Sequence, residues 1–174
     1  VGTDHCDLDA LKSIGIVVTN TPDVLSDATA EISMLLLLGA ARRAVEAQNI
    51  IKEGKWNSWS PSFMVGKQVT GQRLGIIGMG RIGQIVADRA RAFKMKVIYF
   101  NRNKLPKDFE KDATYYSDLK SMLPNCEYIS LHTPATPETK NIINSETLKL
   151  FPKHSVFINT SRGSTVDDDA LIEA

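Results

Sequence analysis

Leu74-Gly75-Ile76-Ile77-Gly78-Met79-Gly80-Arg81-Ile82-Gly83 is the stretch that decides the fold of this chain. Its first four residues predict a short apolar strand, and its last six read G-x-G-x-x-G. After the turn, apolar side chains recur at helical spacing, at Ile82, Ile85, Val86, Ala90 and Phe93. A strand, a tight glycine turn and a helix in this order point free backbone N–H groups at a pyrophosphate. The motif alone is weak, but in this context it favours a dinucleotide site over an ordinary strand–turn–helix corner.

Each glycine of the motif has a separate predicted role. Gly78 permits the turn, Gly80 lets the backbone approach the phosphates, and Gly83 lets the helix pack closely against the strand. Arg81 and Ile82 begin the helix between the second and third glycines. These five residues are therefore predicted to bind the cofactor.

The end of the next predicted strand indicates which dinucleotide binds. Residues 97–100 are followed by Asn101-Arg102-Asn103, and no acidic residue occurs between Arg89 and Lys107. An NAD site usually places Asp or Glu about 20 residues after the glycine motif, where it holds the ribose 2′-OH. A guanidinium instead binds a 2′-phosphate with charge-assisted hydrogen bonds, each of which contributes about 1.5–3 kcal/mol. Asn101, Arg102 and Asn103 therefore predict a preference for NADP over NAD of roughly 10- to 100-fold, with NAD possible if Arg102 is only a solvated loop base.

Composition limits the class of protein. The chain has 174 residues, is 43% hydrophobic and carries a net charge of +1, which is typical of one globular domain or a domain and a half. The near-neutral charge argues against a nucleic-acid binder. Cys6 and Cys126 match no metal or redox spacing, so we expect no metal and a reduced, cytoplasmic setting. The longest apolar run, residues 32–41, is too short to span a membrane.

The first part of the chain is mainly helical by prediction. Residues 7–13 predict a short helix capped by Asp7, and residues 16–19 predict a strand. Residues 27–52 predict one long helix, and residues 55–73 a loop with two tryptophans. The chain begins without Met and ends inside a helix that Asp167 opens, so we expect it to be a piece of a longer protein.

From Leu74 onward, predicted strands and helices alternate. The strands fall at residues 74–77, 97–100, 114–116, 128–132 and 155–159, and the helices at residues 81–94, 118–123 and 145–150. This alternation predicts an α/β fold with a doubly wound, parallel, Rossmann-like sheet. Ligands of such sheets lie at the carboxyl ends of the strands, so the informative loops follow Ile77, Phe100, Leu131 and Ile158.

Those loops, together with several other segments, resemble one enzyme family. The segments are Gly78–Gly83, Asn101–Asn103, His132-Thr133-Pro134, Asn159-Thr160-Ser161-Arg162-Gly163, Gly2-Thr3-Asp4-His5-Cys6-Asp7-Leu8, Asn20-Thr21-Pro22, residues 24–31 and Trp56-Asn57-Ser58-Trp59. Taken together they are similar to the D-isomer-specific 2-hydroxyacid dehydrogenases, nearest to the glyoxylate/hydroxypyruvate reductase branch. The resemblance covers nearly the whole chain and is far more specific than the glycine motif.

The resemblance implies a role for Arg162. In the family, the arginine of this loop binds the substrate carboxylate and steers the keto group. A planar guanidinium fork suits a carboxylate. A structural arginine that ties down the loop is the alternative. The resemblance also implies cofactor contacts at other positions: Thr29 beside the cofactor, Thr133 and Pro134 on the adenine and ribose side, Ser161 toward the nicotinamide, and Thr160.

The resemblance also implies what this chain lacks. The family's general acid is a histidine near the carboxyl terminus that pairs with a glutamate, and neither falls within the 174 residues. His5, His132 and His154 do not match that position, and His132 is expected in the cofactor wall. We therefore expect this piece alone to be inactive and to bind NADP weakly.

The implied organisation has three parts. Residues 1–26 would be a remnant of a substrate domain, residues 27–54 a linking helix, and residues 55–174 a truncated dinucleotide-binding domain. The intact protein is expected to be a homodimer that reduces glyoxylate or hydroxypyruvate with NADPH. An NAD-linked relative such as phosphoglycerate dehydrogenase, a non-catalytic nucleotide sensor like the corepressors of this fold, and a fragment without function remain alternatives.

Overall fold

The fold is built on a five-stranded parallel sheet. The structure, a computed structural model, describes residues 2–174. The strands are β1 (Arg73–Ile77), β2 (Lys96–Phe100), β3 (Thr114–Tyr116), β4 (Tyr128–Leu131) and β5 (Val156–Asn159). All neighbours pair in parallel, in the order β3-β2-β1-β4-β5. The order reverses direction at β1, which confirms the predicted doubly wound sheet.

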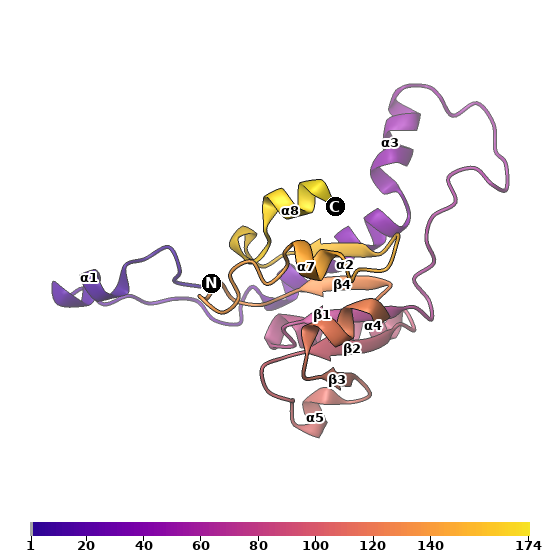
Figure 1. The fold of residues 1–174 in the computed structure, drawn as a ribbon. Helices are drawn as coiled ribbons and strands as arrows, with labels where there is room; N and C mark the ends of the chain where they lie inside the picture. The colour runs from indigo at the N-terminus through magenta and orange to yellow at the C-terminus, as the bar shows by residue number, and fades with distance from the viewer. Residues whose placement is uncertain (1) are drawn as a thin grey trace.

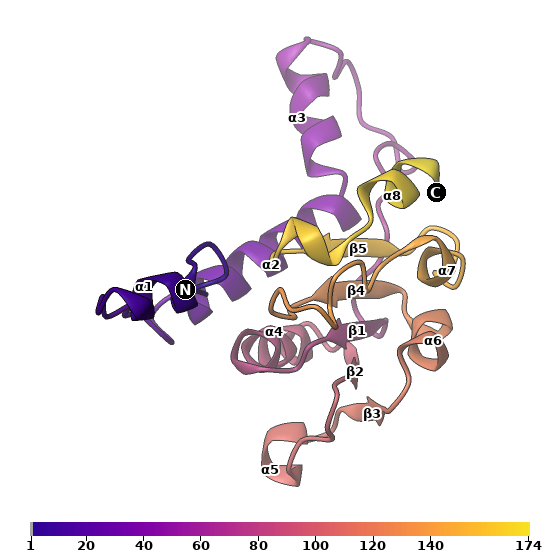
Figure 2. The same cartoon turned by 60° about the vertical axis from the view of Figure 1, so that its left-hand side comes forward.

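Helices cover both faces of the sheet. The helices of the described residues are α1 (Leu8–Ser13), α2 (Ser26–Ala41), α3 (Ala44–Lys52), α4 (Arg81–Ala92), α5 (Lys107–Glu110), α6 (Leu119–Met122), α7 (Ser145–Leu148) and α8 (Asp168–Glu173), with 3₁₀ turns at Leu123–Asn125 and Gly163–Thr165, and some of them cover the faces. Figure 2 shows the sheet edge-on, with α2 and α4 on one side and α6 and α7 on the other. Within residues 2–174, no helix combines the length and the apolar character needed to cross a membrane.

Two apolar cores follow from this layering. One lies between the sheet and helices α2 and α4, and includes Leu37, Ile76 and Val86. The other lies on the opposite face and includes Met122 and Ile129. Strands buried on both faces read as continuous apolar runs, which is why the sequence identified them well.

Strand register brings the ligand-binding loops to one edge of the sheet. Ile77 pairs with Phe100 on one side and with Leu131 on the other, and Leu131 pairs with Asn159. The four strands therefore end at nearly the same level. The loops after β1, β2, β4 and β5 meet at this carboxyl edge, as the sequence predicted.

The prediction of one helix over residues 27–52 was wrong. Helix α2 ends at Ala41, Arg43 adopts a left-handed conformation with φ 56°, and α3 begins at Ala44. The cause is a tertiary contact, because the amide of Lys67 donates to the Ala41 carbonyl at 2.7 Å. Gly66 permits this approach, since a Cβ there would lie 2.4 Å from the Ala41 oxygen.

The strand predicted at residues 16–19 was also wrong. The segment is not part of the sheet, and Ile16 and Val17 are 51% and 84% exposed. Figure 1 shows that this segment and α1 project away from the sheet. A β-branched run forms a strand only beside a partner strand. The helix at residues 8–13 was predicted correctly, with the Asp7 carboxylate accepting from the Ala10 amide at 2.9 Å.

Candidate functional site

A cavity of about 460 Å³ lies at the carboxyl edge of the sheet. It is bounded by the loops after β1, β4 and β5, by the start of α2 and by parts of the N-terminal segment. Nine of the predicted site residues line it, namely Thr29, Gly80, Arg81, Ile82, Thr133, Pro134, Thr160, Ser161 and Arg162. The fold thus gathers residues that lie far apart in the sequence.

The glycines of the corner differ in their surroundings. Gly78 has φ 94°, and a Cβ there would lie 2.9 Å from the His132 backbone. At Gly83, a Cβ would lie 2.5 Å from the Gly78 carbonyl oxygen. Glycine is therefore required at both positions, because a side chain would clash with the neighbouring backbone. Around Gly80 there is no atom within 4 Å of the corresponding Cβ position, so its backbone faces open space.

Some backbone amides of the corner are hydrogen-bonded within the protein, and others are free. The Gly78 amide donates to the Phe100 carbonyl at 3.0 Å, and the Met79 amide donates to Asn101 Oδ1 at 2.7 Å. Over the described range 2–174, the amides of the next three residues, from Gly80 to Ile82, donate to no protein acceptor. Free amides at the start of a 12-residue helix form a binding place for an anion.

The predicted 2′-phosphate residues lie outside the cavity. Asn101 uses its side-chain oxygen to fix the corner, and Arg102 and Asn103 are exposed in the loop after β2. Among residues 2–174, Arg102 takes part in no ion pair, whereas the nearby Lys104 lies 3.4 Å from Glu110 Oε2. The pKa of Glu138, in the loop after β4, is lowered first by its hydrogen bond with Thr136 and to a smaller extent by attraction to Arg102.

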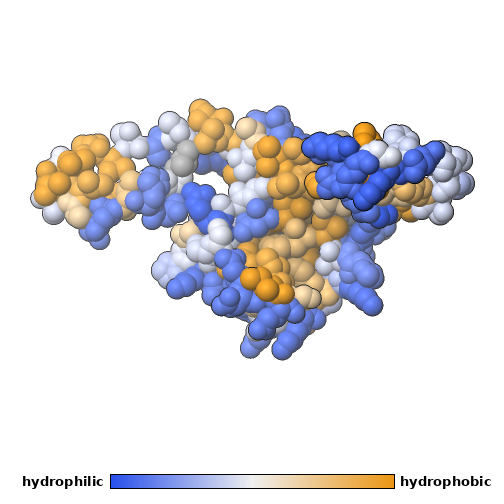
Figure 3. All heavy atoms as spheres, turned by 90° about the horizontal axis from the view of Figure 1, so that it is seen from above, coloured by the Kyte–Doolittle hydropathy of each residue, from blue (hydrophilic) through white to orange (hydrophobic). Residues whose placement is uncertain are grey.

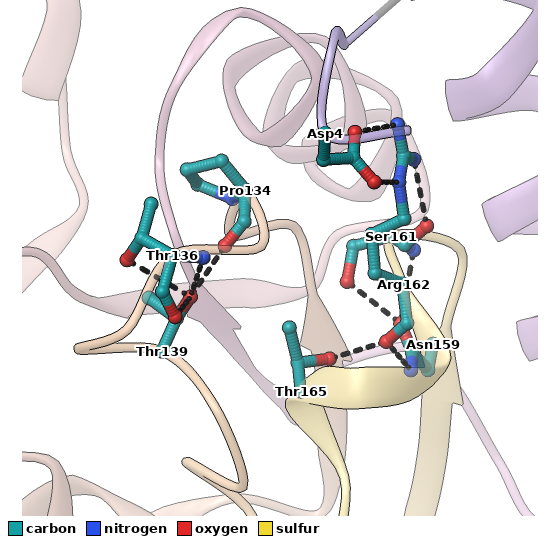
Figure 4. Close-up of polar contacts among 8 residues, drawn as sticks. All are labelled: Asp4, Pro134, Thr136, Thr139, Asn159, Ser161, Arg162 and Thr165. Carbon is teal, nitrogen blue, oxygen red and sulfur yellow. Dashed lines mark hydrogen bonds and ion pairs between the residues drawn. The ribbon is translucent and has the colours of Figure 1, made fainter. Parts of the chain in front are cut away.

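The loop that carries Arg162 is held by its own polar side chains. Asn159 Oδ1 accepts from the amide and the hydroxyl of Ser161 at 2.9 and 2.8 Å, and Asn159 Nδ2 donates to the Arg162 carbonyl at 3.0 Å. Thr165 donates to the same carbonyl at 2.5 Å. These contacts, drawn in Figure 4, set the backbone from which the guanidinium extends.

Two acidic partners of the cavity arginines were not identified from the sequence. Asp4 accepts from Arg162 Nε and Nη2 at 3.0 and 3.1 Å, and Asp23 pairs with Arg81 Nε at 2.7 Å. The hydrogen bond from Arg162 lowers the pKa of Asp4, and the same bond raises the pKa of Arg162. Asp4 lies in a segment that the family resemblance already singled out, but nothing local in the sequence shows a partner 158 positions away.

His132 lines the cavity, and its imidazole is neutral near pH 7. Its Nε2 lies 2.8 Å from the Ser130 hydroxyl, and desolvation lowers its pKa to about 4. The neighbouring Thr133 hydroxyl is buried, and its oxygen has no hydrogen-bond partner among residues 2–174. The cavity therefore combines free amides, two aspartate–arginine pairs and neutral polar groups, a set that can hold a diphosphate and a small carboxylate.

Helix α2 is tied to the loop after β5. Ser33, which is 1% exposed, lies with its hydroxyl 2.8 Å from Thr160 Oγ1 and donates to the Thr29 carbonyl at 2.9 Å. The Thr29 hydroxyl donates to the Leu25 carbonyl at 2.9 Å. These bonds hold one wall of the cavity against another.

Comparison with known proteins relates this chain to 2-hydroxyacid dehydrogenases. The family model of the D-isomer specific 2-hydroxyacid dehydrogenase, NAD binding domain, matches residues 34–174. Glyoxylate reductase from Thermococcus litoralis is 44% identical over 100% of this chain and 54% of its own length. The crystal structure of a glyoxylate reductase from Paecilomyes thermophila matches with a TM-score of 0.88 and 38% identity, over 99% of this chain and 52% of that one.

A second solved structure was determined with ligands. D-lactate dehydrogenase from Aquifex aeolicus, complexed with NAD and lactic acid, matches with a TM-score of 0.89 and 38% identity, over 99% of this chain and 51% of that one. The chain spans about half the length of the relatives that it matches.

Proposed function

This chain belongs to the D-isomer-specific 2-hydroxyacid dehydrogenase family, and on that premise we propose that the intact protein reduces a small 2-keto acid, glyoxylate or hydroxypyruvate, with NADPH. The observation that carries the proposal is the shared cavity, which joins the free amides of the glycine corner to the guanidinium of Arg162. When bound, the nicotinamide supplies the hydride for C2 of the keto acid.

The residues present fit a dinucleotide. The free amides from Gly80 to Ile82 would hold the pyrophosphate, and the open space at Gly80 leaves room for its approach. Thr133 and Pro134 would lie on the adenine and ribose side, and Thr160 and Ser161 toward the nicotinamide. Thr29, Arg81 and Asn103 would complete the contacts, with Arg102 on the 2′-phosphate.

Arg162 would bind the substrate carboxylate and polarise the keto group. Its positive charge stays fixed near neutral pH, since its partner Asp4 raises its pKa further. The proton for the new hydroxyl must come from another group. His132 is unsuited to give it, because its pKa of about 4 leaves it neutral.

Cofactor preference tests the proposal on the intact protein. We expect kcat/KM for glyoxylate or hydroxypyruvate to be roughly 10- to 100-fold higher with NADPH than with NADH. Arg102→Ala should remove that preference by lowering kcat/KM with NADPH alone. Lys107→Ala, the matched control, removes an exposed base of α5 and should change neither value.

Each failure has a distinct meaning. Equal use of NADPH and NADH by the wild-type protein would contradict the role of Arg102 while leaving the reaction class intact. Absence of reduction of either keto acid with both cofactors would contradict the proposed reaction itself.

We also propose that the intact protein is a cytoplasmic homodimer, with the three-part division at residues 1–26, 27–54 and 55–174. Large apolar side chains are exposed along α2, α3 and the loop that follows, at Ile32, Leu35, Leu36, Val45, Ile51, Trp56, Trp59, Phe63 and Val65. Figure 3 shows apolar surface over the α1 end and over the middle of the molecule. Exposed apolar surface of this extent is typical of an interface. Sedimentation equilibrium of the intact protein measures its oligomeric state directly.

A further inference from the structure

The ion pair between Asp4 and Arg162 fixes one edge of the guanidinium. Asp4 Oδ2 accepts from Nε at 3.0 Å and Oδ1 accepts from Nη2 at 3.1 Å, while Nη1 donates to the Ser161 carbonyl at 3.1 Å. Figure 4 shows the carboxylate and the guanidinium facing each other. Arginine has five N–H donors, so one N–H remains on each terminal nitrogen. Two donors are enough for one further carboxylate.

The pair is closely packed at the N-terminal segment. A Cβ at Gly2 would lie 2.7 Å from Asp4 Oδ1 and 2.9 Å from Arg162 Nη2. Gly2, Asp4 and Arg162 all line the cavity. The side chains of Asp4 and Arg162 remain 36% and 40% exposed, and ion pairs this exposed add little to stability. The pair therefore contributes little to folding, and it lies where a ligand in the cavity would meet it.

Asp4 also changes the charge that a ligand meets. The ionised side chains that line the cavity form two pairs of opposite sign, Asp4 with Arg162 and Asp23 with Arg81. A ligand carboxylate that binds the remaining donors of Arg162 shares the guanidinium with the Asp4 carboxylate. A second negative charge on that ligand meets no unpaired cation from these two pairs, and it is repelled by Asp4.

We propose that Asp4 determines substrate specificity by restricting the Arg162 site to acids that carry a single negative charge. The inference rests on the proposed function, because it concerns the carboxylate of the 2-keto acid. Glyoxylate and hydroxypyruvate each carry one negative charge, whereas a keto diacid carries two. Asp4 thus selects among 2-keto acids through charge.

Two probes of nearly equal shape test this proposal. Oxamate carries one negative charge and oxalate two, and neither can be reduced at a keto group. Their dissociation constants are measured by calorimetry with the intact protein saturated with NADPH. In Asp4→Asn, the amide oxygen still accepts from Arg162 but the charge is gone. We expect the ratio of oxalate to oxamate affinity to rise on the order of tenfold over wild type.

Two further variants separate the charge of Asp4 from other effects of substitution. Asp169→Asn removes an exposed acid of α8 and should leave the ratio unchanged. Asp4→Ser, a second variant without the charge, should raise the ratio in the same direction, and thermal unfolding checks that each variant folds. An unchanged ratio in both Asp4 variants, or an equal gain for both probes, would overturn the proposal.

Turnover separates this inference from the proposed function. Asp4→Asn should gain kcat/KM on oxaloacetate, a keto diacid, relative to glyoxylate. If the wild-type protein reduces no keto acid, the proposed function fails, and the two binding ratios still report whether Asp4 discriminates by charge.

Discussion

At the scale of single residues, two glycines of one motif have different surroundings, one crowded and one open. Gly83 is required because the Gly78 carbonyl occupies the place of a side chain, whereas Gly80 has open space on that side. The sequence predicted the packing role of Gly83, which is local to the strand–turn–helix corner, and the role of Gly80 beside the phosphates stays a prediction. It could not predict Asp4 beside Arg162, because that contact depends on how distant segments meet.

This difference predicts that substitution by alanine lowers stability at Gly83 and weakens cofactor binding at Gly80. Gly83→Ala should lower the free energy of unfolding by about 1–3 kcal/mol, because the methyl group overlaps the Gly78 carbonyl. Gly80→Ala should change it by less than about 0.5 kcal/mol but weaken NADPH binding, because its methyl group projects into the space where phosphates approach. Urea unfolding and NADPH titration measure the two effects. Equal destabilisation by both variants would contradict the assigned roles.

At the scale of elements, the end of β2 supports the glycine corner after β1. Asn101 Oδ1 accepts from the amide of Met79, which is fully buried. Asn101 was predicted to contact the cofactor, and the structure shows its side-chain oxygen bound to the protein. The carboxyl end of one strand therefore shapes the glycine turn that follows its neighbour.

Two substitutions at Asn101 separate this support from cofactor choice. Asn101→Ala should lower the free energy of unfolding by about 1–3 kcal/mol, since it leaves the buried Met79 amide without an acceptor. Asn101→Asp keeps an acceptor and should stay closer to wild type in urea unfolding. Its new charge should weaken NADPH binding more than NADH binding. A larger loss of stability in Asn101→Asp than in Asn101→Ala would show that the hydrogen bond is not the cause.

Elements were predictable where their signals are local. The strands β1, β2 and β4 were found within one residue, and the helix predicted from residue 145 does begin there as α7, with Asn144 as its cap. The break at Arg43 was missed, because the Lys67 amide that ends α2 belongs to a loop far along the chain. The strand expected at residues 16–19 failed for the converse reason, since its apolar pattern lacks a neighbouring strand in the sheet.

At the scale of the whole molecule, the order of strands decides which groups are buried beside the cavity. Because β4 lies between β1 and β5, the loop that follows it is enclosed by the loops on both sides. His132 begins that loop, and its backbone lies where a side chain at Gly78 would otherwise be. The sequence placed His132 in the cavity wall, but the extent of its desolvation follows only from the assembled sheet.

This burial predicts how the stability of the protein depends on pH. The pKa of His132 is lowered from its ordinary value of 6.5 to about 4, so the unfolded chain binds its proton more readily than the folded one. Protonation of His132 therefore does not reduce the free energy of unfolding above pH 6.5. The free energy of unfolding falls as the pH drops from 6.5 toward 4. The loss should amount to about 2–3 kcal/mol in the free energy of unfolding. Urea unfolding at intervals between pH 7.5 and 4 measures it.

Substitution identifies His132 as the source of this dependence. His132→Gln cannot gain the proton, so its free energy of unfolding should vary much less between pH 6.5 and 4.5. His5→Gln removes an exposed histidine and should keep the wild-type slope. Carboxylates with lowered pKa, such as Glu127 beside Arg73, act in a lower range, below about pH 4.5. A wild-type slope that persists in His132→Gln would mean that His132 is already charged, or well solvated, in the folded protein, and a proton on it would then be available beside the cavity.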